Sequence, residues 1–250
     1  MKHKWKEDVA LPEDAKDALA AFCEEVVEAA GDQLDAIILY GGITKGEYNE
    51  DTSDVNILLA LKDINLETLD NIAPCVQHGR RDVRIAPIIL SDKDLKRSTD
   101  VFPIKFLDIK EHHTLLWGTD VLEALPIEQE HLRLRCEQEL KNLNLRLRSF
   151  YIQRINRAER IEQTLVQILP PFLISMDALL YLKDGKHYVT KDAIISATKD
   201  VLGLENKVLR TLLSIKLGQH EAKLDELRTI YESFMKIVDQ AADIADQIEE

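Results

Sequence analysis

The chain has 250 residues, of which 45% are hydrophobic and 31% are charged, and its formal net charge is −13. This balance is typical of a soluble, folded protein and excludes a disordered chain. No apolar run approaches the ~20 residues that a membrane-spanning helix needs, and the basic start of the chain lacks the apolar core of a secretory signal. We therefore expect a cytoplasmic protein that makes no contact with a membrane.

The acidic charge is concentrated in the first half of the chain. Residues 1–125 carry 14 Lys and Arg against 25 Asp and Glu, a net charge of −11, whereas residues 126–250 carry 18 against 20, a net charge of −2. A chain without a broad basic face is not expected to bind duplex nucleic acid. Backbone amides can still hold a small anion, because they need no net charge. The three cysteines form no CxxC pair, so neither a disulfide framework nor a structural zinc site is expected.

The first half mixes short apolar runs with turns, which predicts an α/β domain with a mixed sheet. We expect helices at 12–30 and 66–76, and strands at 34–40, 55–61, 82–90 and 114–117. Proline cannot donate a hydrogen bond to a neighbouring strand, so Pro87 places the third strand at an edge of the sheet or makes it end there.

The second half is helical throughout, which predicts a bundle of four or five antiparallel helices. One long periodic stretch runs from Ile127 to Pro170 with no Gly or Pro inside it, and the Pro170-Pro171 pair is expected in a loop. Further helices are expected at 172–182, 191–202, 205–217 and 220–248. The sequence thus predicts two domains, an α/β domain at 1–125 and an all-α helical bundle at 126–250.

A glycine-rich turn follows the first expected strand, and a Ser-Asp pair stands before the second. Alternate residues of a strand project to one face, so Asp54 and Asn56 share a face at the mouth of the second strand. Exposed amides in a turn bind phosphate oxygens, and paired side-chain oxygens suit Mg²⁺. The residues concerned are Gly41, Gly42, Thr44, Lys45 and Gly46 in the turn, and Ser53, Asp54 and Asn56 after it.

This pattern resembles the signature of the nucleotidyltransferase superfamily, the fold of the kanamycin nucleotidyltransferases and their minimal relatives. Gly41 and Gly46 match the two glycines of that signature, Ser53-Asp54 matches its Ser-Asp pair, and the order of the two domains agrees. The resemblance implies a Mg²⁺-bound ATP or other NTP as substrate. It also implies transfer of a nucleoside monophosphate to the hydroxyl of a small-molecule or protein acceptor. The roles it implies are catalysis and metal binding for Asp54 and Asn56, and nucleotide binding for Gly41, Gly42, Thr44, Lys45, Gly46 and Ser53.

Three positions depart from the family pattern. Gly42 stands where the family has a serine, Asn56 where it has a second metal-binding aspartate, and Arg84 where it has a third carboxylate. Asparagine offers a neutral oxygen in place of a charged one, so the site loses a negative charge opposite Mg²⁺. Asp82, two residues away on the expected strand, or Asp108 further on would then supply the missing carboxylate. Alternatively, Arg84 pairs with Asp54 and takes the place of the metal.

Two functional hypotheses remain open. The first is a nucleotidyltransferase with weak or altered activity. The second is a catalytically degenerate protein of the same fold that serves as a nucleotide-binding or protein-interaction module, with a homodimer formed through the helical domain. An ordinary strand-ending turn at Gly41-Gly42 and a purely structural Asn56 are the simpler interpretations of the same residues.

Overall fold

The structure is a computed structural model that describes residues 4–7, 9–49 and 53–248. The chain divides into two compact units. The first comprises Met1–Thr99 and Lys105–Pro126, and the second comprises Asp100–Ile104 and Ile127–Glu250. The units therefore change after Pro126, and the second also takes in a short segment from the middle of the α/β part.

The first unit is built on a four-stranded mixed sheet with the strand order β3-β2-β1-β4. β1 runs antiparallel to both of its neighbours, and β2 runs parallel to β3. β3, which contains Pro87, lies at an edge of the sheet as the sequence predicts, because there its missing N–H breaks no ladder. The strands are β1 (Leu34–Tyr40), β2 (Val55–Leu61), β3 (Ile85–Ser91) and β4 (His113–Gly118).

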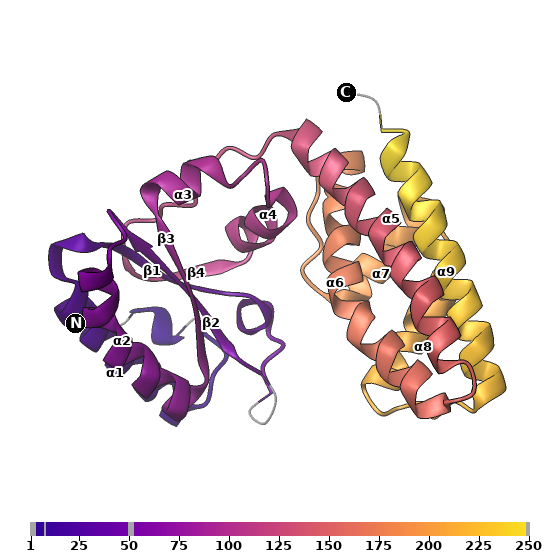
Figure 1. Cartoon of the computed structure of the whole chain (residues 1–250), viewed down its shortest axis with the longest axis horizontal. Helices are drawn as coiled ribbons and strands as arrows, with labels where there is room; N and C mark the ends of the chain where they lie inside the picture. The colour runs from indigo at the N-terminus through magenta and orange to yellow at the C-terminus, as the bar shows by residue number, and fades with distance from the viewer. Residues whose placement is uncertain (1–3, 8, 50–52, 249–250) are drawn as a thin grey trace. The chain divides into compact units, whose positions relative to one another are not determined.

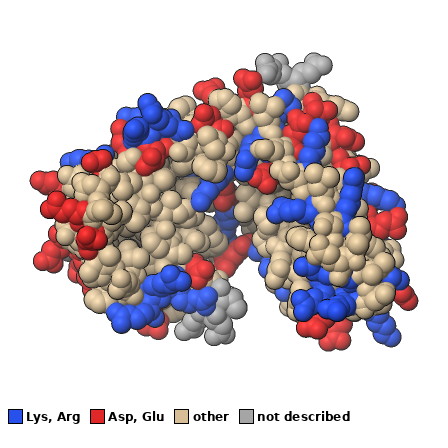
Figure 2. All heavy atoms as spheres, viewed as in Figure 1, with Lys and Arg blue, Asp and Glu red and all other residues tan. Residues whose placement is uncertain are grey.

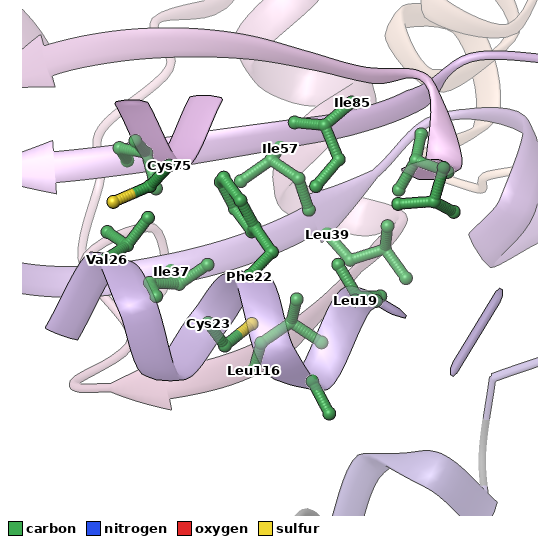
Figure 3. Packing of buried hydrophobic residues seen from close by; sticks show 14 of the residues in the cluster. Leu19, Phe22, Cys23, Val26, Ile37, Leu39, Ile57, Cys75, Ile85 and Leu116 are labelled. Atoms are coloured by element: carbon green, nitrogen blue, oxygen red, sulfur yellow. The ribbon is translucent and has the colours of Figure 1, made fainter. Parts of the chain in front are cut away.

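The helices α1 (Glu13–Ala30) and α2 (Leu66–Val83) lie on one face of this sheet (Figure 1). Their apolar faces pack with inward-facing strand residues into one core, and Figure 3 shows Phe22 of α1 at its centre, beside Ile57 and Ile85. The opposite face is buried as well, because Ile38 and Leu58 have no exposed area. The remaining elements of this part are η1 (Lys4–Glu7), η2 (Gly31–Gln33), η3 (Gly42–Lys45), α3 (Asp92–Arg97) and α4 (Pro103–Glu111).

The sequence-based boundary between α2 and β3 is wrong. The helix continues to Val83, seven residues past its expected end, and the strand begins only at Ile85. Gly79 lies inside the extension, and a Cβ there would lie 2.8 Å from side-chain atoms of both Phe22 and Ile85. Gly79 therefore serves as a close-packing point inside the helix. Asp82 consequently lies on α2 and not on the strand beside the candidate site.

The second unit is a bundle of helices, so the predicted fold class of an α/β part followed by an all-α part is confirmed. Its elements are α5 (Gln129–Arg154), α6 (Ala158–Asp184), α7 (Lys191–Asp200), α8 (Lys207–Lys216) and α9 (Leu224–Asp246). The predicted continuous stretch from 127 to 170 is wrong, because the chain turns at 155–157 and the prolines at 170 and 171 lie inside α6.

Tertiary contacts explain both differences. At the turn, the guanidinium of Arg228 on α9 donates to the Ile155 carbonyl at 3.4 Å and to the Asn156 side chain at 3.3 Å. Inside α6, Leu169 and Phe172 on either side of the proline pair are at most 1% exposed. Their burial offsets the cost of an interior proline, which is about 3 kcal/mol.

α6 is long and apolar enough to cross a membrane by length and composition alone. More than half of its most apolar window, 56%, is buried inside the structure. A helix of this kind is expected at the centre of a bundle, where it is apolar on most sides.

All three cysteine thiols are buried and free, which leads to a test of the packing. Burial raises the pKa of Cys23 and of Cys136 to about 12, and it also raises the pKa of Cys75. The thiolate is the reactive form, so we expect the folded protein to resist a thiol reagent such as DTNB at about pH 8. All three thiols should react only as the chain unfolds in denaturant. Rapid labelling of one thiol per chain in the native protein would contradict this packing.

Candidate phosphate-binding site

The residues that the sequence singles out lie together where β1 ends and where β2, β3 and β4 begin, which is called the site edge of the sheet below. Tyr40, the last residue of β1, pairs with Asn56 near the start of β2 and with His113 at the start of β4. β2 and β3 begin together, with Val55 opposite Ile85. The glycine turn after β1, Asp54 before β2 and Arg84 before β3 therefore lie at the same edge.

The glycine turn packs directly against Asn56. Gly41 has a φ of 87°, and a Cβ at this position would lie 2.9 Å from the Asn56 side-chain nitrogen. The turn closes as η3 with Gly46 in the left-handed conformation, where its N–H donates to the Ile43 carbonyl at 3.1 Å. The amides of Gly42 and Ile43 belong to the first turn of η3, where helix geometry provides no intrahelical acceptor. Such amides suit an anion.

The hydroxyls of Thr44 and Ser53 hold the loops in place. The Thr44 hydroxyl lies 2.7 Å from the Gly41 carbonyl and 2.8 Å from the His112 carbonyl, so it links the turn to the start of β4. The Ser53 hydroxyl accepts a hydrogen bond from the Asn49 amide at 2.9 Å, closing the loop whose residues 50–52 lie outside the described part. The nucleotide-binding roles expected for both side chains stay predictions.

Asp54 and Arg84 form the ion pair that the sequence suggested, with 3.3 Å between the guanidinium and the carboxylate. Both side chains are open to solvent, with 57% of Asp54 and 45% of Arg84 exposed. The backbone of Arg84 is fixed at φ 54°, where its N–H donates to the Gly79 carbonyl and its own carbonyl accepts from Val55. An exposed pair of this kind contributes about 0–1 kcal/mol.

Lys45 forms a second ion pair with Asp108 on α4, and this one is largely buried. Only 14% of the Lys45 side chain and 18% of the Asp108 side chain are exposed. The pair ties the glycine turn to α4. Asp108, one of the two residues suggested as the missing carboxylate, is therefore engaged by a cation of the turn.

The residues at this edge do not fit a two-metal centre. Asp54 supplies one carboxylate and Asn56 a neutral amide, and β3 places Ala86 beside Asn56. No Asp or Glu occurs anywhere in β3. Within residues 4–7, 9–49 and 53–248, no group of three or more His, Cys, Asp or Glu residues is arranged to hold a metal ion. Mg²⁺ binding stays a prediction that this geometry does not favour.

Two further side chains share the site face. Tyr40 and His113 pair in register with each other, and Tyr40 pairs with Asn56, so the three form a row across the sheet. Burial raises the pKa of Tyr40 to about 12, which keeps its hydroxyl protonated. His113 is held by the Lys110 carbonyl at 2.8 Å and by Asp120 at 2.9 Å. Side chains alternate between the two faces of a strand, and directly paired residues of neighbouring strands share a face. Antiparallel pairing of the two expected strands, with Tyr40 opposite Asn56, could therefore have identified Tyr40 from the sequence.

Comparison with known proteins supports the fold. No protein-family model and no curated protein matches this sequence. Among solved structures, the chain is similar to the spectinomycin adenyltransferase AAD(9) from Enterococcus faecialis, determined with ATP and spectinomycin. The TM-score is 0.56 at 10% sequence identity, and the match covers 90% of this chain and 98% of that chain. At this identity the likeness shows the fold alone, which is the nucleotidyltransferase-like fold of an α/β part followed by helices.

Proposed function

We propose that this chain is a nucleotide-binding protein of the nucleotidyltransferase fold that holds the triphosphate of ATP, or of another NTP, without depending on a divalent cation. The guanidinium of Arg84 lies on the carboxylate of Asp54, where the family resemblance places a metal ion, and this observation carries the proposal. Transfer of a nucleoside monophosphate is then slow or absent. We place the protein in the cytoplasm, where its ligand is found.

The charges and donors at the edge suit an anion. A guanidinium presents several donors in a rigid fork that matches phosphate geometry, and it stays charged at every physiological pH. The first-turn amides of η3 lie at the same edge of the sheet and add neutral donors. Arg84 and Asp54 together carry no net charge, so binding depends on these donors and on the phosphate taking the place of the Asp54 carboxylate on Arg84.

The alternative function is a metal-dependent nucleotidyltransferase that acts on a small-molecule or protein hydroxyl. It is favoured by the 57% exposure of the Asp54 side chain, which leaves the carboxylate accessible despite its ion pair. The similar solved structure was determined with ATP and spectinomycin, which agrees with either function. The two functions differ in their requirement for Mg²⁺.

Calorimetric titration with ATP, in EDTA and in Mg²⁺, distinguishes them. We expect the wild-type affinities under the two conditions to agree within about threefold. Arg84→Gln should weaken binding in EDTA about tenfold, equivalent to about 1.4 kcal/mol, whereas Arg84→Lys should lose less. Both substitutions share the left-handed backbone of this position, so their comparison isolates the charge. Arg80→Gln, an exposed position in the last turn of α2, is the control and should bind ATP normally.

A double variant tests whether the site can be converted into one that binds ATP through Mg²⁺. Asn56→Asp with Arg84→Gln restores a second carboxylate and removes the competing cation, so ATP binding should become dependent on Mg²⁺. A wild-type protein that binds ATP only with Mg²⁺ and transfers labelled nucleotide to an acceptor would instead establish the metal-dependent enzyme.

A further inference from the structure

We propose that two copies of this chain associate through the outer face of α5, in antiparallel orientation. Three large aliphatic side chains occupy this face, with 46% of Leu134, 62% of Leu145 and 75% of Ile152 exposed. At 100° per residue, spacings of 11 and 7 residues place all three within about 20° of one line along the helix. The side of α5 that faces the bundle is packed separately, by Leu132, Cys136, Leu140, Leu143 and Leu147.

The charge of this region changes along the helix. Residues 145–160 contain five arginines and one glutamate, which gives this segment a net charge of +4, whereas the whole chain has a net charge of −13. Arg146, Arg148 and Arg157 have no ion-pair partner in the described part of the chain, and the same holds for Glu130 at the other end of α5. Figure 2 shows basic side chains gathered over the end of the helical unit where Figure 1 places the turn between α5 and α6.

An antiparallel second copy would cover the exposed aliphatic residues and would also bring the arginine-rich end of α5 to the other end of its partner. When Leu134 lies opposite Ile152 of the second copy, Leu145 lies opposite the methylene stem of Lys141, whose ammonium pairs with Glu137 of its own chain. Glu130 then approaches the arginine-rich turn of the second copy. A parallel arrangement would place arginines against arginines, which is unfavourable. The face is therefore complementary to itself, as an interface with two-fold symmetry requires.

In this arrangement Ile152, the most exposed of the three aliphatic residues, meets a groove on the second copy. Beside Leu134 lies a groove of about 620 Å³, whose apolar lining is Leu134 and the half-exposed Val101 and whose other lining residues, from Asp100 and the first turns of α5, are polar or charged. In the antiparallel arrangement Ile152 of the second copy enters this groove. The stripe from Leu134 to Ile152 is about 27 Å long. An interface of this length lies at the small end of stable protein contacts, so we infer a dissociation constant in the micromolar range.

Sedimentation velocity from about 5 to about 500 µM tests the association. The wild-type chain should shift from monomer to dimer across this range. Leu145→Arg should raise the dissociation constant at least about tenfold without affecting folding, because the side chain is 62% exposed. Leu217→Arg, at a 59% exposed position after α8, is the control and should dimerise as the wild type does. A wild-type chain that stays monomeric at the highest concentration would overturn the proposal.

Disulfide trapping tests the orientation. Mixing Leu134→Cys protein with Ile152→Cys protein should give a crosslinked dimer under mild oxidation, whereas Leu134→Cys alone should not crosslink. The natural cysteines are buried and do not interfere. Crosslinking of Leu134→Cys with itself, or no crosslinking in the mixture, would show that the antiparallel register is wrong. This proposal concerns the helical unit only, so its outcome is independent of nucleotide binding.

Discussion

Replacing Gly118 with alanine should destabilise the first unit by about 3 kcal/mol or more. Gly118 pairs with Ala36 at the end of β4 and has a φ of 88°. A Cβ there would lie 2.0 Å from the Asp35 carbonyl oxygen and 2.9 Å from the carbonyl carbon. These are backbone atoms of β1, so they cannot rotate away, and the β1–β4 pairing would have to open. Urea unfolding followed by circular dichroism measures the loss.

The matched control is Gly46→Ala in the same unit. Gly46 also has a positive φ, at 73°, but among the residues that the structure describes no atom beyond its own chain neighbours lies within 4 Å of the position that a Cβ would take. The left-handed conformation alone costs an L-residue about 1–2 kcal/mol. If the two variants lost equal stability, the close approach of Gly118 to β1 would not be the cause.

Asp108→Asn is expected to lower the free energy of unfolding by about 2–3 kcal/mol, because it leaves the ammonium of Lys45 mostly buried beside a neutral amide. The double variant Lys45→Met with Asp108→Leu removes both charges and should recover most of this loss. Lys96→Met, which removes an exposed i,i+4 ion pair with Asp92, serves as the control and should cost less than about 1 kcal/mol.

Urea titrations of the four proteins give the comparison. A double variant that is less stable than Asp108→Asn would show that the ion pair contributes directly to stability. A single variant as stable as the wild type would mean that Lys45 reaches solvent and does not tie the glycine turn to α4.

Local patterns decide how much of the fold the sequence predicts. β1 and β2 have the predicted bounds, because continuous apolar runs there are flanked by glycines or polar loops. The end of α2 is not predictable, because a glycine often follows the end of a helix, whereas Gly79 lies inside α2 and accommodates Phe22. The turn between α5 and α6 depends on Arg228, which is more than 70 residues away in the chain.

In the candidate site, too, local patterns are predictable from the sequence and contacts with distant elements are not. Strand order and alternation bring the glycine turn, Asp54 and Asn56 to one edge, and the sequence predicts this. The charge of Arg84 and its position opposite Asp54 also allow their ion pair to be anticipated. The pairing of Lys45 with Asp108 was not predictable, because it depends on the placement of α4, 63 residues further along the chain. Sequence thus fixes which residues meet through regular strand pairing, whereas contacts with distant helices require the structure.

Amide chemical shifts during an ATP titration test most directly whether the glycine turn binds the triphosphate. Selective ¹⁵N-glycine labelling gives nine amide signals from this chain. We predict that ATP, added in EDTA, shifts the signals of Gly41, Gly42 and Gly46, while those of Gly203 and Gly218 in the helical unit stay in place. If the turn signals did not move at saturating ATP, or moved only when Mg²⁺ was added, the cation-independent phosphate site would be contradicted.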